Sequence, residues 1–310
     1  MKLRRLAGYA ALGAGGLLAA TRGLRETEPL EPPLAGEQHS ARWRGMEIAY
    51  TEAGDPDDPD LVFVHGTSAV ASSGEWREVF DRLAAEYHVV APDLPGFGRS
   101  DRPPIRYSPE LYEDFLREFL ADYEEPAVLA SSLSGAYAVD AAADAAVSRL
   151  LLVCPSVRGG PEPPRTWVRE LLRAPVVGEA LFDLIVSRPA IRYFNADHGY
   201  YDESNLTADW IDYEWRTGHR PNARFAPASF LAGFLNVDFD LGSRLAELDV
   251  PTTLFWGREA EVSPLSRGRE IAETADARLV VFDDARLLPH VEYPGQFVEE
   301  IQTSMGGGDR

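Results

Sequence analysis

Ser132 lies in a cluster of small residues between a short apolar run and an alanine-rich stretch. Residues 126–131 are typical of a buried strand, and the stretch that follows, to about Ala145, is typical of a helix. A serine in a sharp strand-to-helix turn is a candidate nucleophile, and close packing there requires small side chains two residues before and after it. Ala130 and Ser134 meet this requirement. In a second frame Ser134 is the nucleophile, but that frame prolongs the strand and shortens the helix, so we prefer Ser132.

Two motifs upstream of Ser132 end predicted strands. Residues 61–67 read Leu-Val-Phe-Val-His-Gly-Thr, an apolar run of the buried-strand type that ends in His-Gly. A helical stretch is expected from about Glu75 to Glu86, and a second strand at 88–91. Residues 93–101 follow this strand and read Asp-Leu-Pro-Gly-Phe-Gly-Arg-Ser-Asp.

These motifs, at this spacing and before the serine turn, strongly resemble the α/β-hydrolase family, from about Ser40 to the C-terminus. The resemblance implies an oxyanion hole formed by the backbone N–H groups of Thr67 and Leu133. His65 matches a structural histidine of the loop. The fold implied is α/β, a mostly parallel doubly wound sheet with a helical lid insertion, and strands that alternate with helices agree with it.

The motifs downstream of Ser132 resemble the strand and loop patterns of the family but lack its catalytic acid and histidine. Residues 250–264 resemble the strand and loop on which the family carries the acid of its catalytic triad, and that position is Ala260. The last strand is expected at 277–283. The segment after it resembles the family's Gly-His-x-Pro-His-x-Glu-x-Pro signature, with Leu287 at the position of the catalytic histidine.

A serine hydroxyl is a weak nucleophile near neutral pH and requires a base within about 2.6–3.2 Å. His290, which matches the second histidine of the signature, is a candidate substitute base, with Glu259 or Glu261 as the acid. Neither glutamate is expected to point where Ala260 points, because consecutive residues of extended chain face opposite sides. Two hypotheses stay open: an esterase-like hydrolase with a rebuilt triad, and a non-catalytic member that binds a ligand or serves as an interaction scaffold.

Residues from about 157 to 240 are expected to form the lid, with helical patterns rich in aromatic residues. Such lids hold apolar or mixed ligands and exclude water, so a small ester or apolar acyl compound is the expected ligand. His198 and His219 are interpreted as polar residues of the lid. We expect no cofactor and no metal site, because no pair of His, Cys or Glu has metal-ligand spacing. A dehalogenase is excluded, because that chemistry requires an aspartate followed by tryptophan where Ser132 and Leu133 stand.

The sequence divides into three segments. Residues 1–22 combine a basic start with an uncharged, Ala-, Gly- and Leu-rich stretch, which predicts a signal or a membrane anchor and so an exported or membrane-anchored protein. The alternative is a helix packed on the domain of a cytoplasmic protein. Residues 23–39 read as a Pro- and Glu-rich linker, and residues 40–310 as a single α/β-hydrolase domain. The oligomeric state is not predicted.

The chain is strongly acidic: 30 Lys and Arg oppose 50 Asp and Glu, for a net charge of −20, and Lys2 is the only lysine. This charge repels nucleic acid, which we exclude as a partner. Arginine in place of lysine, with a carboxylate-rich surface, indicates adaptation to high salt. The single cysteine, Cys154, cannot form an internal disulfide and is interpreted as a buried apolar residue.

Stability is therefore expected to depend on salt. Lowering potassium chloride from about 1 M to about 0.01 M lengthens the Debye length from about 3 to 30 Å, so repulsion between carboxylates grows. We expect the far-ultraviolet circular dichroism of the folded protein to be lost in this titration. Full retention of the signal at low salt contradicts adaptation to high salt.

Overall fold

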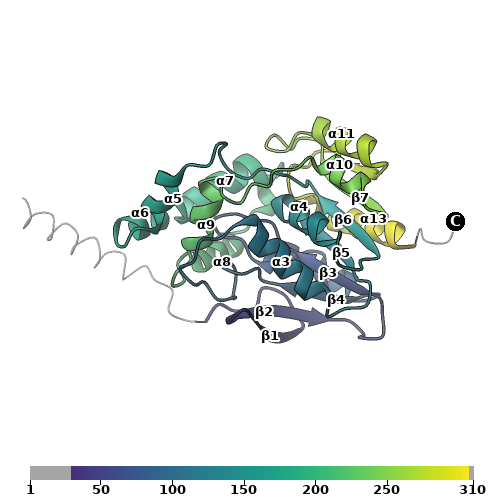
Figure 1. The fold of residues 1–310 in the computed structure, drawn as a ribbon, viewed down its shortest axis with the longest axis horizontal. Helices are drawn as coiled ribbons and strands as arrows, with labels where there is room; N and C mark the ends of the chain where they lie inside the picture. The colour runs from purple at the N-terminus through teal and green to yellow at the C-terminus, as the bar shows by residue number, and fades with distance from the viewer. Residues whose placement is uncertain (1–28, 307–310) are drawn as a thin grey trace, which may run out of the picture.

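A computed structural model describes residues 29–306 of the chain, and within them the strands form one eight-stranded sheet (Figure 1). The order across the sheet is β1-β2-β4-β3-β5-β6-β7-β8. The β1–β2 and β2–β4 pairs are antiparallel, and the remaining pairs are parallel. The strands are β1 (Glu37–Trp43), β2 (Met46–Ala53), β3 (Asp60–Val64), β4 (His88–Pro92), β5 (Ala127–Ser131), β6 (Arg149–Val153), β7 (Thr252–Gly257) and β8 (Arg278–Phe282).

The central strands are buried on both faces. On β3, Val62 and Val64 belong to one hydrophobic cluster, while Leu61 and Phe63 belong to another, because successive side chains of a strand point to opposite faces. The first cluster includes residues of α3 (Pro109–Leu120), α4 (Ser132–Ala141), α10 (Leu241–Ala246) and α11 (Leu265–Ala275). The second includes residues of η1 (Ser73–Trp76), α2 (Phe80–Leu83) and α13 (Pro294–Gly306). The predicted α/β class with a mostly parallel sheet is confirmed.

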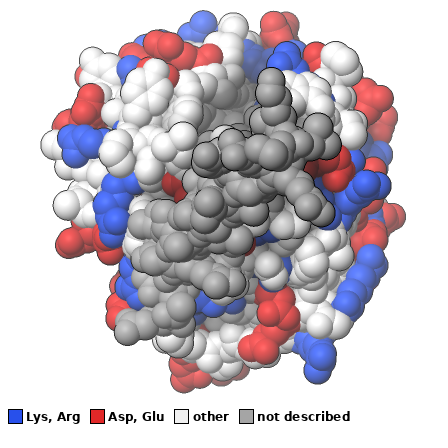
Figure 2. Space-filling view, turned by 90° about the vertical axis from the view of Figure 1, so that its left-hand side faces the viewer, with Lys and Arg blue, Asp and Glu red and all other residues white. Residues whose placement is uncertain are grey.

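Between β6 and β7 the chain adds further helices, within the range predicted for a lid. They are α5 (Thr166–Arg173), α6 (Val177–Ile185), α7 (Arg188–Phe194), η2 (Asn195–Gly199), η3 (Glu203–Asn205), α8 (Ala208–Gly218) and α9 (Phe225–Leu231). We call them the inserted helices. Part of the insertion has a hydrophobic cluster of its own around Phe182, Ile191 and Tyr200. α5 and α6 lie at one end of the molecule (Figure 1), and Figure 2 views that end directly.

Glu292 of α12 (Pro289–Glu292) joins the inserted helices to the loop after β8. Its Oε1 accepts the backbone N–H groups of Tyr201 (2.8 Å) and Asp202 (3.0 Å), and its Oε2 accepts that of Arg286 (2.9 Å). The Arg286 guanidinium donates in turn to the carbonyls of residues 196 and 197, at 2.7 Å each. Hydrogen bonds to charged groups contribute about 1.5–3 kcal/mol each, so this loop and the insertion are firmly connected.

The predicted signal or anchor at 1–22 lies outside the described residues. The predicted linker at 23–39 is described from Pro29, and part of it packs on the domain: Leu30 and Leu34 are each 5 % exposed, and β1 begins at Glu37. Leu30 and Leu34 make this apolar contact, which the Pro- and Glu-rich composition of the segment did not predict. Among residues 29–306, no helix has the length and apolar character needed to cross a membrane.

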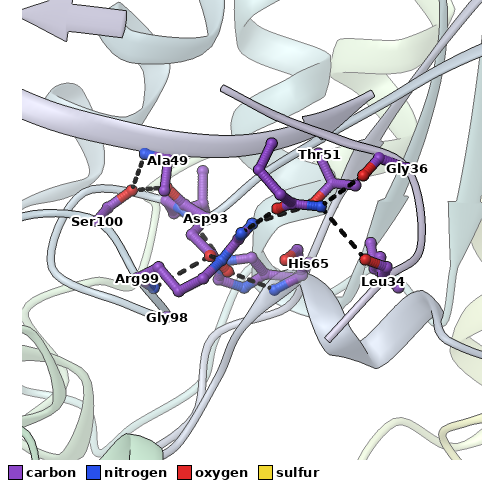
Figure 3. A network of polar contacts seen from close by, with 12 residues as sticks. Leu34, Gly36, Ala49, Thr51, His65, Asp93, Gly98, Arg99 and Ser100 are labelled. Atoms are coloured by element: carbon purple, nitrogen blue, oxygen red, sulfur yellow. Dashed lines mark hydrogen bonds and ion pairs between the residues drawn. The ribbon is translucent and has the colours of Figure 1, made fainter. Parts of the chain in front are cut away.

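Asp93, directly after β4, is the centre of a buried polar network (Figure 3). Its Oδ1 accepts the N–H of Ser73 (2.7 Å), and its Oδ2 accepts the N–H and Nε–H of Arg99 (3.0 and 2.9 Å). Ser100 Oγ donates to the Asp93 carbonyl and accepts the N–H of Ala49. The network holds the loop of residues 93–101 against β2 and η1.

Gly98 leaves room for this network, so replacing it should destabilise the fold. Its φ is +49°, and an added Cβ would lie 2.0 Å from Asp93 Oδ1. We expect Gly98→Ala to lower the free energy of unfolding by about 3 kcal/mol or more, because Asp93 must move away from its donors. The control is Gly45→Ala, since Gly45 has φ +85° and open space around it, so only the left-handed strain of about 1–2 kcal/mol applies. Urea denaturation in high salt measures both, and equal losses contradict the role of the network.

Candidate active site

Ser132 follows β5 directly and begins α4, with a φ of +53°. A left-handed conformation costs a non-glycine residue about 1–2 kcal/mol, so the surrounding packing must impose it. Helix and sheet are close here: a Cβ added at Gly135 would lie 3.0 Å from the Cβ of Pro155. Ser132 is half-buried, whereas Ser134 is fully buried inside α4. The strained turn thus falls on the serine that the sequence favoured.

The loop after β3 passes beside Ser132. A Cβ built on Gly66 would lie 3.3 Å from the Cβ of Ser132, and Thr67 is the next residue. Leu133 is in the first turn of α4, where helix N–H groups have no acceptor within the helix. Within residues 29–306, the buried Thr67 Oγ1 has no hydrogen-bond partner. The assignment of Thr67 and Leu133 to an oxyanion hole stays a prediction.

His65 fixes the loop after β3 to the loop after β4. Its Nε2 accepts the N–H of Leu94 at 3.0 Å, so the proton is on Nδ1, which donates to the carbonyl of Gly66 at 2.7 Å. Burial lowers the pKa of the imidazole, which therefore stays neutral. Because backbone groups occupy both nitrogens, His65 acts as a structural residue in this arrangement.

Ala260 and Leu287 stand on the loops after β7 and β8. Ala260 is 4 % exposed, Leu287 is partly buried, and both belong to the hydrophobic cluster that contains Leu133. The carboxylate Oε2 of Glu259 accepts the N–H of Ala285 at 3.1 Å, which fastens one loop to the other, and Glu261 is exposed. At the two positions where the family resemblance implies an acid and a base, the chain thus presents apolar side chains to apolar neighbours.

His290, the candidate substitute base, is fully buried at the start of α12. Its ring lies 4.6 Å from the ring of Trp76 and 5.6 Å from that of Phe297, measured between centroids. Neither of its nitrogens has a hydrogen-bond partner among the described residues, so no hydrogen bond joins it to Ser132 there. Burial, and secondarily the charge of Arg77, lowers the pKa of His290 to about 3.

Glu75, a half-buried residue beside the turn, was not selected by the sequence analysis. Its Oε2 accepts the N–H of Gly66 at 2.8 Å, and the Ser131 hydroxyl also bonds to its carboxyl group. Its Oε1 lies 3.7 Å from Nε2 of His290. Burial raises the pKa of Glu75, against the opposing effect of these hydrogen bonds. The only sequence signal was an acidic residue before Trp76, at the start of a predicted helix, where a solvated charge is the usual interpretation.

The remaining candidates serve local structure. Nδ1 of His219 lies 2.8 Å from the carbonyl of Trp215, and its ring stacks on that residue at 4.3 Å. His198 lies 3.3 Å from Asp197 on the surface. Cys154 is buried, and burial raises the pKa of its thiol to about 12. In the part of the chain that the structure describes, no group of three or more His, Cys, Asp or Glu is arranged to hold a metal ion.

Comparison with known proteins defines the class. Residues 61–300 match the Alpha/beta hydrolase family, and the chain belongs to this family. An uncharacterized protein of Mycobacterium tuberculosis (strain ATCC 25618 / H37Rv) is 26 % identical over 92 % of this chain and 84 % of its own length. The 2-hydroxy-6-oxo-6-phenylhexa-2,4-dienoate hydrolase of Comamonas testosteroni is 25 % identical over 76 % of this chain and 82 % of its own.

The fold is also similar to a solved structure described as a membrane phospholipase A, a bacterial virulence factor. The TM-score is 0.69 at 23 % identity, over 98 % of this chain and 95 % of the other. At this identity the likeness concerns the fold alone.

The burial of His290 predicts a pH dependence of stability. Because its folded pKa of about 3 is below the unfolded value of 6.5, the unfolded state binds the proton first as the pH falls. The contribution of a neutral His290 is fully present above pH 6.5 and is lost toward pH 3, at up to about 1.4 kcal/mol per pH unit. We expect His290→Phe to reduce the slope of unfolding free energy between pH 6.5 and 5. The exposed His198→Phe is the control, and an unchanged slope in His290→Phe refutes the assignment.

Proposed function

We propose that this α/β-hydrolase binds a small ester or apolar acyl compound at Ser132, beneath a lid formed by the inserted helices, without the proton relay of a serine hydrolase. The observation that carries the proposal is the pair of apolar side chains, Ala260 and Leu287, in the hydrophobic cluster that also contains Leu133. An activated serine requires a base in contact with its hydroxyl. Leucine cannot accept the proton, and alanine cannot orient an imidazole.

The binding half of such a site is supported by other features. The left-handed φ of Ser132 fits the strained strand-to-helix turn of this family, and the family resemblance assigns the backbone N–H groups of Thr67 and Leu133 to a carbonyl oxygen. The buried hydroxyl of Thr67 is a further polar group free to bind a ligand within the described part of the chain. The hydrolase of Comamonas testosteroni supports a small organic acyl compound as the class of ligand.

A second candidate function is slow ester hydrolysis with a rebuilt base. The favouring observation is the half-buried Glu75, whose Oε2 accepts the N–H of Gly66, whose carboxyl also bonds to the Ser131 hydroxyl, and whose Oε1 lies 3.7 Å from His290. If His290 moved into contact with Ser132, the result would be a Ser-His-Glu series in which Glu75, rather than Glu259 or Glu261, orients the imidazole. Oxyanion stabilisation and binding alone leave about 10³–10⁴-fold catalysis in a protease that has lost its triad, so weak turnover does not by itself favour this candidate.

A fluorophosphonate probe separates the two candidates. Under the first, the protein in high salt is labelled no faster than Ser132→Ala, because the serine hydroxyl is not activated. Gel fluorescence over time measures the rate, and Ser134→Ala tests the alternative frame. Rapid labelling of the parent protein that disappears in Ser132→Ala overturns the first candidate. If Glu75→Gln and His290→Phe also abolish this rapid labelling, the result supports the rebuilt base.

Restoring the missing pair should create activity. We expect Ala260→Asp combined with Leu287→His to hydrolyse p-nitrophenyl butyrate at least about 100-fold faster than the parent, which equals about 2.7 kcal/mol of barrier. The matched control combines Ala260→Asn with Leu287→Gln, which brings similar polarity without a base. A folded double variant no faster than this control contradicts the view that only these two groups are missing.

A further inference from the structure

Exposed apolar side chains concentrate on the inserted helices. Among the described residues, eleven large hydrophobic side chains are exposed, and eight of them fall between residues 167 and 201. Trp167 and Leu184 are the most open, at 66 % and 68 %. A monomeric soluble protein rarely exposes a large contiguous apolar patch without an interaction to explain it. We define the apolar face as the members of this set on α5 and α6: Trp167, Leu171, Val177, Leu181 and Leu184.

The apolar face follows helical periodicity. On α5 its two members are four residues apart, and on α6 its three members are spaced by four and three residues, which places them on one side of each helix. The opposite sides contain the buried Leu172 and Phe182. The two helices touch, because a Cβ added at Gly178 would lie 2.3 Å from the carbonyl oxygen of Leu172. Both helices are thus amphipathic, with a second apolar stripe that no described part of the chain covers.

The start of the described chain lies beside one of the inserted helices, α8. Pro33 and the ring of Trp210 on α8 both contact the space beside Gly74, at 2.8 and 2.9 Å from where its Cβ would be. Pro33, near the start of the described chain, therefore lies next to an inserted helix. The sequence before Pro29 contains the uncharged stretch Leu6–Thr21 and five basic residues against two acidic ones.

Charge around the apolar face differs from that of the whole protein. Residues 166–194 contain four arginines and three acidic residues, in a chain with a net charge of −20. All four arginines are in ion pairs, Arg169 and Arg173 with Glu170, Arg188 with Asp212 and Arg192 with Glu203, and Glu179 pairs with Arg224. Around the residues drawn in grey, Figure 2 shows uncharged side chains with both arginine and acidic side chains among them. This segment is thus close to neutral, so it adds little to the repulsion between the acidic chain and an anionic bilayer.

We propose that the apolar face rests in the interfacial layer of a phospholipid bilayer, with the N-terminal segment as a second attachment. Trp167 and the α6 side chains enter the boundary between headgroups and acyl chains, where an amphipathic helix buries its apolar side. The inserted helices then lie between the membrane and the strand ends that carry Ser132. This proposal is independent of whether Ser132 is activated.

Quenching of tryptophan fluorescence by lipids with brominated acyl chains tests the proposal on the full chain. The segment before Pro29 contains no tryptophan, so its insertion alone places no fluorophore in the bilayer. With vesicles of phosphatidylcholine and phosphatidylglycerol in stabilising salt, we expect quenching that Trp167→Phe lowers about threefold or more. Leu184→Ser should shift the ratio of quenched to unquenched protein by about tenfold, the effect of removing one buried leucine. Val262→Ser is the control, since Val262 is 59 % exposed on the loop after β7.

Three outcomes overturn the proposal. Vesicle binding with the same quenching in Trp167→Phe shows that the N-terminal segment alone attaches the protein. A dimer in sedimentation experiments without lipid, dissociated by Leu184→Ser, shows that a second copy covers the face. A blue-shifted Trp167 emission without lipid, in a monomer that vesicles do not quench, shows that the chain's own N-terminal segment covers it.

Discussion

The burial of the parallel strands on both faces is the constraint on which the rest of the structure depends. A strand whose two sides are both apolar must be covered twice, and a parallel neighbour can be reached only through a crossover. The carboxyl ends of β3, β5, β6, β7 and β8 therefore meet at one edge of the sheet. Thr67, Ser132, Ala260 and Leu287 follow four of these strands, and the inserted helices follow the fifth. The site exists because the sheet leaves no other place for these loops to converge.

Short sequence patterns made many of the strands and turns predictable. The apolar runs of β3 and β5, the small residues around Ser132 and the proline signature before α12 each act over a few residues, and the strands and turns formed where these patterns indicated. Glu75 could not be found this way. Its hydrogen-bond partners Gly66 and Ser131 and its neighbour His290 are distant in sequence, and nothing local distinguishes a buried glutamate from a surface one. The packing of Leu30 and Leu34 was missed for the same reason, because composition hides individual contacts.

If the proposed function is correct, Ala260 and Leu287 replace an acid–base pair without damage to the fold. An isolated acid or imidazole among apolar neighbours costs free energy unless it is hydrogen-bonded, so losing one partner alone leaves the other unsatisfied. Alanine and leucine at the two positions remove both polar groups together and let their loops pack. Two polar groups, Glu75 and His290, remain close to each other near the turn. The pKa of Glu75 is raised and that of His290 is lowered, so both shifts favour the neutral forms. Each shift reduces the cost of holding a titratable group in the interior without a strong ion pair.

The contacts of Glu292 and Arg286 couple parts of the molecule that are distant in the chain. They fasten residues 196–202, near the middle of the insertion, to the loop that presents Leu287. A ligand that pushes Leu287 aside thus works against the insertion as well, while α5 and α6 lie upstream of these contacts. These contacts join the loop and the adjoining part of the insertion, so a ligand bound at the proposed site would be limited in size by how far both can move together.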